Sequence, residues 1–320
     1  MILTGDVGGT KTLLALHDEH GGLVVRRRYS SREAATFDAL VARFLDEAAA
    51  KPRLACFGVA GPVLGGRVKV THLPWEVDAA ALQARFGLRG VCLLNDFAAA
   101  AHGLDALSAA DLVTLQAGAP LPARPKLVIG AGTGLGVAYV QGGQVLSGEG
   151  GHAAFAPADA RQAALWQWLH QRLGRVQVEH VVSGRGLSHI YEFLRSQAPD
   201  AAPAGGAVAP AEDAAAEIGR RALQDGDSLS LAALDLFFSC YGSVAGDHAL
   251  TVLALGGVYL SGGIAPKLLP RLAVGGLLAA FNDKGAQSHL TRACPLHVVT
   301  NSDLPLLGAA RHAANTLTAV

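Results

Sequence analysis

The chain is poor in charged residues and in cysteine, and both scarcities argue against whole classes of function. Only 16% of its 320 residues are charged, and 26 acidic against 26 basic residues give a formal net charge of zero. A nucleic-acid-binding protein usually carries a basic excess, so this balance argues against nucleic acid as a partner. The four cysteines include no Cys-x-x-Cys pair, which argues against a zinc knuckle or a dithiol redox motif and fits a reducing cytosol. Cys56 and Cys92 lie in apolar runs and are expected to be small core residues rather than reactive thiols.

Targeting and membrane-spanning segments are also missing from the pattern. Asp6 interrupts the apolar N-terminus, so no signal peptide is expected. The uncharged stretch 127–148 is long enough to cross a bilayer, but seven glycines at turn positions interrupt it. We therefore expect a buried hairpin there, in a cytoplasmic protein without a membrane partner.

Core material is abundant, because 51% of the residues are hydrophobic, enough for one large domain or two ordinary ones. The first third predicts three antiparallel strands followed by alternating helices and strands, which indicates a mixed sheet covered by helices. Apolar residues recur at helical spacing after Thr36, which is suited to cap that helix. The expected strands are 2–7, 12–17, 23–29, 54–59 and 91–94, and the expected helices are 37–45 and 76–86.

The second part of the chain restarts the opening pattern of a strand, glycines and a strand. The expected strands are 126–131, 137–140, 144–147, 257–261 and 296–300, and the expected helices are 160–173, 228–253 and 305–317. The closing helix is expected to pack back on the first part of the chain. The stretch 196–213 is rich in Ala, Pro and Gly and predicts an exposed, mobile loop of unassigned role.

Two glycine turns are the most informative motifs, Asp6-Val-Gly-Gly-Thr-Lys11 and Gly130-Ala-Gly-Thr-Gly-Leu-Gly136. Without a Cβ, glycine lets backbone N–H groups approach a phosphate, while threonine adds a hydroxyl donor and lysine a positive charge. Either motif alone favours a plain hairpin turn, and neither is a Walker loop. Their occurrence in both parts indicates a nucleotide cleft between two lobes and phosphoryl transfer. The candidate nucleotide-binding residues are Gly8, Gly9, Thr10, Lys11, Gly132, Thr133 and Gly134.

Asp96 follows the apolar run 91–94 and precedes an alanine-rich segment, and two roles fit it equally. A sugar hydroxyl is a poor nucleophile, so a carboxylate that takes its proton would assist phosphoryl transfer. An aspartate before a helix is also a common N-cap. Asp6 offers hard oxygen to Mg²⁺ through water, or a hydrogen bond to its own turn.

The segment Glu149-Gly-Gly-His152 places an acid and an imidazole beside flexible backbone. Sugar hydroxyls need both acceptors and donors, and this pair supplies them. Taken alone, however, a surface acid and a structural histidine in an ordinary loop are the more frequent case, and Glu179 has the same ambiguity. The pair Gly262-Gly263 would let an adenine ring lie flat on the backbone, although a strand-to-helix turn is the more frequent use of such a pair.

In order along the chain, these motifs resemble the bacterial glucokinase family of the hexokinase-like, actin-fold superfamily. The resemblance runs nearly end to end, and its ordered set of motifs is very specific. The matching segments are Gly5-Asp-Val-Gly-Gly-Thr10, Ala60-Gly-Pro-Val63, Leu94-Asn-Asp-Phe97, Gly130-Ala-Gly-Thr-Gly-Leu-Gly136, Gly148-Glu-Gly-Gly-His152, Phe155-Ala-Pro157, Glu179 before Ser183-Gly184, Ser261-Gly-Gly-Ile264 and Leu307-Gly-Ala309.

The resemblance implies an α/β fold of the two-lobed actin-like or ribonuclease H-like type, with a mixed sheet and flanking helices in each lobe and a cleft between them. It implies a small domain, 1–104 with 302–320, and a large domain, 105–301. The implied reaction is phosphorylation of glucose at its 6-hydroxyl by ATP with Mg²⁺. Asp96 would be the base, and Asn95, Glu149, His152 and Glu179 would hold the sugar. Gly262 and Gly263 would belong to the adenosine segment, Asp6 would hold Mg²⁺ through water, and a homodimer is implied.

Departures from the family pattern are small. Arg185 stands where proline is expected, and Ala154 where an acid is frequent, which puts local loop shape in doubt rather than function. Related sugar kinases with a cysteine-rich zinc motif fit less well, because the chain has no such cluster near His152.

Three other functions stay open. A non-catalytic sugar sensor such as a repressor would need DNA-binding helices, but the strand expected from Ile2 leaves no room ahead of it. An actin-like scaffold would leave Glu149, His152 and Glu179 unexplained. A kinase for another hexose is not separated, because hydroxyl recognition depends on fine geometry. The donor, whether ATP, ADP or polyphosphate, stays open as well.

Overall fold

A computed structural model describes residues 1–18, 21–71, 73–197 and 214–317. The chain divides into two compact units. Unit 1 consists of Met1–Asp111, Val145–Ser147 and Asn301–Val320, and unit 2 of Leu112–Gln144 and Gly148–Thr300. The predicted domains, 1–104 with 302–320 and 105–301, stay a prediction, because compact units need not be independently folding domains.

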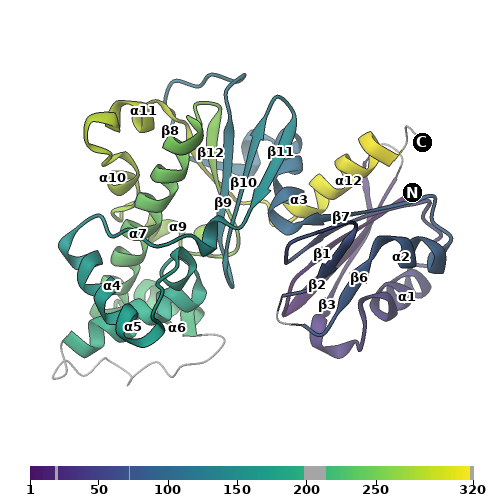
Figure 1. The fold of residues 1–320 in the computed structure, drawn as a ribbon, viewed down its shortest axis with the longest axis horizontal. Coiled ribbons are helices and arrows are strands. Elements are labelled where there is room, and N and C mark those ends of the chain that lie inside the picture. The colour runs from purple at the N-terminus through teal and green to yellow at the C-terminus, as the bar shows by residue number, and fades with distance from the viewer. Residues whose placement is uncertain (19–20, 72, 198–213, 318–320) are drawn as a thin grey trace. The chain divides into compact units, whose positions relative to one another are not determined.

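Unit 1 contains a five-stranded mixed sheet in the order β3-β2-β1-β4-β7 (Figure 1). β1 (Ile2–Val7), β2 (Lys11–His17) and β3 (Leu23–Ser30) form an antiparallel meander. β4 (Leu54–Val59) and β7 (Gly90–Asn95) run parallel to β1. The five predicted strands of this part of the chain are confirmed within one residue or two at their ends.

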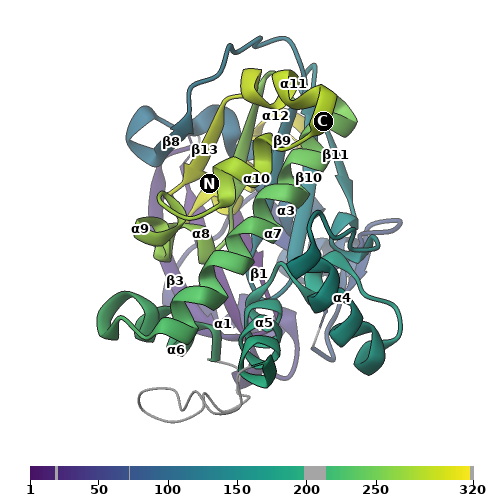
Figure 2. The same ribbon diagram turned by 90° about the vertical axis from the view of Figure 1, so that its left-hand side faces the viewer.

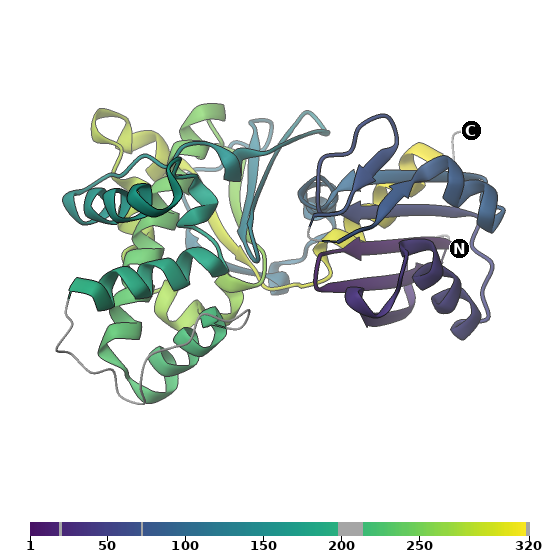
Figure 3. The ribbon, with the colours of Figure 1, turned by 60° about the horizontal axis from the view of Figure 1, so that its bottom comes forward.

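Helices cover both faces of this sheet, as the predicted layering required (Figures 1 and 3). α1 (Phe37–Glu47) buries its apolar face in a core that includes Leu3 and Leu14 of the sheet. Thr36 caps α1 as predicted, because its side chain accepts a hydrogen bond from the Ala39 N–H. On the other face lie α3 (Asp96–Gly103) and the closing helix α12 (Leu304–Leu317), and α12 packs on α3, β1 and β4. The expected return of the closing helix to the first part of the chain is therefore confirmed.

The helix expected over 76–86 is three residues shorter than predicted. Glu76–Asp78 forms β6, which pairs with β5 (Arg67–Lys69) in a small antiparallel sheet that the sequence analysis missed. α2 starts at Ala79 and ends at Phe86, because the Asp78 side chain accepts hydrogen bonds from the N–H groups of Ala80 and Ala81. Aspartate is a strong N-cap residue, and it fixes the start of the helix where apolar periodicity alone does not.

Unit 2 is built on a six-stranded sheet in the order β11-β10-β9-β12-β13-β8. Its strands are β8 (Leu112–Gln116), β9 (Lys126–Ala131), β10 (Leu135–Gln141), β11 (Gln144–Gly148), β12 (Gly257–Ser261) and β13 (Leu296–Val299). β8 was not predicted. The hairpin expected over 127–148 is present, but only its first strands are buried, since β11 is mostly exposed.

The helices of unit 2 pack around a core that centres on α7 (Ser228–Val252), the long green helix in Figure 2. The others are α4 (Ala160–Leu173), α5 (Gly184–Gln197), α6 (Ala214–Arg220), α8 (Ile264–Lys267), α9 (Leu269–Leu272), α10 (Leu277–Asn282) and α11 (Ser288–Ala293). Short 3-10 or π segments occupy Ser31–Glu33, Leu104–Ala106, Ala109–Asp111, Gly150–His152, Val178–His180, Arg221–Asp225 and Gly285–Gln287. Ser196 and Gln197 end α5 rather than opening the predicted loop, and the rest of that loop, 198–213, lies outside the described residues.

Among the described residues, α7 alone has the length and hydropathy to cross a membrane. In this structure 72% of its most apolar window is buried inside the protein. Phe237, Phe238 and Tyr241 are fully enclosed, and the Tyr241 hydroxyl donates to the Ile129 carbonyl in β9. The apolar composition of α7 is therefore explained by its place in the core.

α3 and α12 approach each other so closely that only glycine fits at the contact. A Cβ on Gly308 would lie 1.8 Å from the Ala99 carbonyl oxygen and 2.6 Å from the Gly103 nitrogen. A Cβ on Gly103 would lie 2.5 Å from the Leu304 carbonyl oxygen. Because the opposing atoms belong to the backbone, neither helix can relieve the clash by a rotamer change.

We expect Gly308→Ala to lower the free energy of unfolding by roughly 2–3 kcal/mol, the upper part of the usual overpacking range. Urea unfolding of the purified chain measures the change. Asn315→Ala, at an exposed position of the same helix, is the matched control and should change stability by about 0.5 kcal/mol or less. Equal stability of Gly308→Ala and the unmodified chain would contradict the close contact.

Candidate functional site

The first glycine motif forms the turn between β1 and β2. The Gly8 N–H donates to the Lys11 carbonyl oxygen at 3.0 Å, which closes the turn. Ser31, which the sequence analysis did not single out, braces it: its hydroxyl donates to the Gly8 carbonyl at 2.7 Å and its N–H to the Thr10 carbonyl at 3.0 Å. Thr10 and Lys11 are exposed, so their donors are free to meet a ligand from solvent. The hairpin expected at this motif is confirmed, and its geometry allows phosphate contacts.

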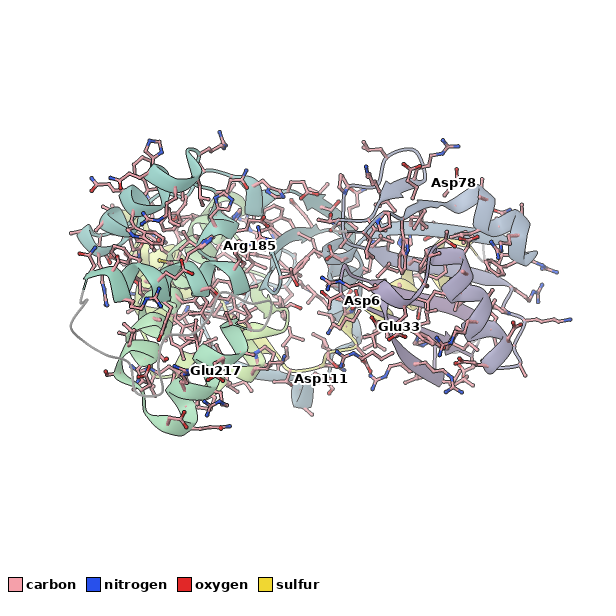
Figure 4. The ribbon with its side chains drawn as sticks, turned by 90° about the horizontal axis from the view of Figure 1, so that it is seen from below. Asp6, Glu33, Asp78, Asp111, Arg185 and Glu217 are labelled. Carbon is pink, nitrogen blue, oxygen red and sulfur yellow. The ribbon has the colours of Figure 1, made fainter. Side chains whose placement is uncertain are left out.

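Asp6 lies near the end of β1, directly before this turn (Figure 4). Its loss of hydration in the sheet raises its pKa to about 6, with the Lys11 charge opposing this rise and the Asp303 charge adding to it. Within the described residues, no three acids, histidines or cysteines are grouped closely enough to form a complete metal cage. A single carboxylate of this kind suits Mg²⁺, which usually keeps several waters and uses one or two protein oxygens with substrate phosphates.

Asn95 and Asp96 stand where β7 passes into α3. The Asn95 side-chain oxygen accepts hydrogen bonds from the N–H groups of Phe97 at 3.0 Å and Ala98 at 3.3 Å, so Asn95 is the N-cap of this helix. The capping role considered for Asp96 is therefore wrong. Asp96 is the first residue of the helix, half-buried, where the helix dipole favours its negative charge. The Asp96 side chain accepts from the Phe97 N–H at 2.9 Å, and its role as general base stays a prediction.

The strand register places the first glycine turn and Asp96 at the same edge of the sheet. Val7 pairs with Val59 in β4, and Val59 pairs with Asn95 in β7, all in parallel strands. The carboxyl ends of β1, β4 and β7 are therefore level, and the glycine turn and Asp96 follow from the same edge. Ligands of open α/β sheets bind at such edges. Gly58 of β4 was missed by the sequence analysis, and a Cβ there would lie 2.8 Å from the Ala99 side chain at the start of α3.

In unit 2 the structure brings together Glu149, His152 and Glu179, which the sequence analysis selected from separate segments. His152 Nε2 lies 3.8 Å from Glu149 Oε2, and His152 Nδ1 lies 3.8 Å from Glu179 Oε1. Gln177 was not selected, although its side-chain oxygen is 3.0 Å from His152 Nδ1. An amide oxygen only accepts, so His152 carries its proton on Nδ1 and leaves Nε2 free to accept. The choice between a sugar site and an ordinary surface loop stays a prediction, but the structure does bring the three selected side chains together.

The second glycine turn lies against this cluster. The Leu135 N–H donates to Glu179 Oε2 at 3.4 Å, and a Cβ on Gly134 would lie 2.8 Å from the same oxygen. The Gly132 N–H donates to the Gly134 carbonyl at 2.9 Å, while the Gly132 carbonyl accepts from Gly184 at the start of α5. Thr133 is exposed at the tip. The second glycine turn therefore lies beside both the carboxylate of Glu179 and the N-terminus of α5.

Gly262 and Gly263 form a strand-to-helix turn between β12 and α8, as the more frequent use of such a pair predicts. Gly262 has φ +84°, and a Cβ on it would lie 2.6 Å from the Ala131 carbonyl oxygen. Since Ser261 pairs with Gly130 in parallel strands, this turn and the Gly132 turn share one sheet edge. Two residues depart from the family pattern. Arg185 is exposed in the first turn of α5 (Figure 4), and Ala154 forms an isolated antiparallel β-bridge with Gln177. Neither residue displaces one of the selected site residues.

Comparisons with known proteins agree on one family. A family model described as glucokinase matches residues 3–316. The glucokinase of Nostoc sp. is 39% identical, with 98% of this chain and 99% of that protein aligned. A glucokinase crystal structure from an Antarctic psychrotroph is 30% identical, covers 98% of this chain and 99% of its own, and has a TM-score of 0.83. A ROK family glucokinase from Streptomyces griseus, in complex with glucose and AMPPNP, shares the fold at 20% identity and a TM-score of 0.67, covering 98% and 99%.

The raised pKa of Asp6 predicts a pH-dependent stability with a definite sign. The folded state holds the proton more tightly than the unfolded state, whose carboxyl has a pKa near 3.8. The resulting stabilisation is complete below pH 3.8 and is lost as the pH rises through about 6. Asp6→Asn removes this loss, so it should raise the free energy of unfolding at pH 7.5 by about 1–2 kcal/mol and leave it unchanged at low pH.

Urea unfolding of the chain without nucleotide or divalent metal, at pH 7.5 and at a pH below 3.8, tests this expectation. Asp46→Asn, at an exposed position of α1, is the control and should show no such difference between the two pH values. A loss of stability in Asp6→Asn at pH 7.5 would show that the carboxylate is well solvated or well paired in the fold.

Proposed function

The chain belongs to the glucokinase family, and within it we propose how individual residues divide the work of the reaction. The protein is an ATP-dependent glucokinase, which transfers the γ-phosphoryl group of ATP to the 6-hydroxyl of glucose and yields glucose 6-phosphate and ADP. The observation that carries this conclusion is the match over nearly the whole length of both chains. The two-lobed α/β fold expected from the sequence is that of the sugar kinases and is confirmed.

Asp96 is the proposed general base. It stands at the carboxyl end of β7, level with the first glycine turn, and the capping duty at this position belongs to Asn95. One carboxylate oxygen of Asp96 accepts a hydrogen bond from the Phe97 N–H at 2.9 Å, and we propose that this carboxylate takes the proton of the sugar hydroxyl as that oxygen attacks the γ-phosphorus. The helix N-terminus stabilises the ionised form that a base requires.

Asn95, Asp96, Glu149, His152 and Glu179 are the proposed glucose-binding residues. Carboxylates accept hydrogen bonds from sugar hydroxyls, and the free Nε2 of His152 accepts another. Gln177 holds the imidazole in this tautomer through Nδ1. Glu179 is shared between the cluster and the second glycine turn, so the sugar-binding and nucleotide-binding parts of unit 2 are fixed relative to each other.

The proposed ATP contacts come from the three glycine turns. Gly8, Gly9, Thr10 and Lys11 serve in unit 1, and Gly132, Thr133, Gly134, Gly262 and Gly263 in unit 2. The exposed hydroxyls of Thr10 and Thr133 and the exposed ammonium of Lys11 suit phosphate oxygens, and Gly263, where a Cβ would meet nothing, leaves backbone bare for the adenosine. We propose that Asp6 holds Mg²⁺ through water, and bound Mg²⁺ would neutralise charge that develops on the phosphates.

A homodimer completes the proposal on the grounds of the family resemblance, and a cytoplasmic location on the grounds of four cysteines without a Cys-x-x-Cys pair. The zero net charge argues against a nucleic-acid partner. A coupled assay of ADP release from Mg-ATP, with and without glucose, tests the activity. Glucose-dependent release is the expected result. Comparing mannose and fructose as acceptors, and ADP and polyphosphate as donors, then maps the specificity. No release with any sugar or donor, from protein shown to be folded, would favour a non-catalytic sugar sensor.

Replacing the proposed base gives the sharpest test of the mechanism. We expect Asp96→Asn to keep glucose binding while kcat falls by about 10²–10⁴-fold, the usual worth of general-base catalysis. The assay is steady-state kinetics, with glucose binding followed by calorimetry. Asp46→Asn is the control and should retain the unmodified kcat. Turnover of Asp96→Asn within a few-fold of the unmodified enzyme would remove Asp96 from the role of base.

A second substitution separates sugar binding from nucleotide binding. Glu149→Ala removes a carboxylate from the cluster around His152, so it should raise KM for glucose by about tenfold or more while KM for ATP changes little, since a hydrogen bond to a charged group is worth about 1.5–3 kcal/mol. Glu192→Ala, on α5 of the same unit, is the control. Equal increases in both KM values would mean that Glu149 is not a sugar ligand.

A further inference from the structure

Cys56 and Cys92 are paired across two neighbouring strands, although 35 residues separate them in the sequence. Both lie on the face of the sheet that α12 covers, and Cys56 is the register partner of Cys92 between β4 and β7. Neighbouring strands lie about 4.8 Å apart, inside the range of about 4.4–6.8 Å that a disulfide requires between Cα atoms. The two side chains are hydrogen-bonded thiols in this structure.

The two cysteines differ in their access to solvent. Cys56 is fully buried beneath Ala309 and Ala313 of α12. Cys92 is only half-buried, and its strand β7 is the edge of the sheet. The expectation that both are small core residues is confirmed for Cys56, whereas Cys92 packs at the margin of that core on an edge strand, a position that the sequence does not reveal.

Two histidines complete the surroundings of Cys92. His312 of α12 is hydrogen-bonded to the Cys92 sulfur. The ring of His312 contacts the ring of His102 from α3, with centroids 4.4 Å apart. Burial, and next the charge of His312, lower the pKa of His102 to about 4, so His102 is neutral.

This arrangement favours a thiolate at Cys92. The Cys56 thiol donates to the Cys92 sulfur and, with His312, lowers the pKa of Cys92, while the same contact and burial raise the pKa of Cys56. The remaining cysteines have the opposite environment, since burial raises the pKa of Cys294 to about 11 and that of Cys240 further. Low-pKa, accessible thiolates are the ones that react with oxidants.

We propose that Cys92 is a peroxide-reactive thiolate and that Cys56 is its resolving thiol. The Cys92 thiolate attacks one oxygen of hydrogen peroxide, the O–O bond breaks, and hydroxide leaves, giving a sulfenic acid at Cys92. The Cys56 sulfur then displaces the sulfenic hydroxyl, which leaves as water with the Cys56 proton. The products are a Cys56–Cys92 disulfide and water, with two electrons passed from the thiols to the peroxide.

A zinc or copper site is the competing use of two thiols and two imidazoles. It is not favoured, because no group of three such ligands close enough to hold an ion occurs in the part of the chain that the structure describes. The redox proposal needs only the cross-strand pair and the access of Cys92. It also does not depend on the roles proposed for Asp96 or the sugar-binding residues.

Mass spectrometry of the full chain tests the proposal. After treatment with hydrogen peroxide and alkylation of the remaining thiols, the Cys56 and Cys92 peptides should be joined, lighter by two hydrogens and separated by dithiothreitol. Cys240 and Cys294 should stay alkylated. In Cys56→Ser the sulfenic acid at Cys92 should persist and react with dimedone, and in Cys92→Ser no cysteine should be oxidised.

The alkylation rate of Cys92 provides a second measurement that does not require loss of a cysteine. At pH 6.5 iodoacetamide should modify Cys92 about tenfold or more faster than Cys294, and His312→Asn should slow it by a similar factor. His289→Asn, on α11, is the matched control and should leave the rate unchanged. Oxidation of Cys92 no faster than Cys294, or a disulfide between any other pair, would overturn the proposal.

Discussion

The rest of this protein depends on one constraint: neighbouring parallel strands end at the same edge of the sheet. In unit 1, hydrogen bonding aligns Val7, Val59 and Asn95, so the turn after β1 and the helix after β7 both begin from one line. A shift of one residue in either pairing would move the start of α3, and Asp96 with it, away from this line. The position of the proposed base is therefore set by backbone pairing before any side chain contributes.

Unit 2 uses the same constraint at β9 and β12, where the pairing of Ser261 with Gly130 places two glycine turns at one edge. Close contacts restrict which residues fit at this edge. Gly262 has no room for a Cβ against the Ala131 backbone, and a Cβ on Gly134 would displace the Glu179 carboxylate. Glycine is needed at Gly262 because only a residue without a Cβ lets the two turns pack this closely.

The packing of α3 against α12 is equally close. α3 begins with Asp96, and it is held by α12 through the contact of Gly308 with the Ala99 backbone. The same two helices carry the contacting rings of His102 and His312, and α12 also covers the Cys56–Cys92 pair. One helix–helix contact thus supports both the helix that begins with the proposed base and the helix that covers the proposed oxidation site.

The amino-acid sequence by itself determined the strand and helix pattern, the glycine turns and the family, because alternation, helical spacing and ordered motifs are local properties of the chain. It also selected Asp96, Glu149, His152 and Glu179. It did not determine that Asn95 rather than Asp96 caps α3, that Gln177 orients His152, or that Asp78 starts α2 in place of a longer helix. Nor did it pair Cys56 with Cys92 or place Cys92 on an edge strand. These features depend on which strands are neighbours and on how closely helices approach, and contacts between residues far apart in the chain leave no periodic signal in the sequence.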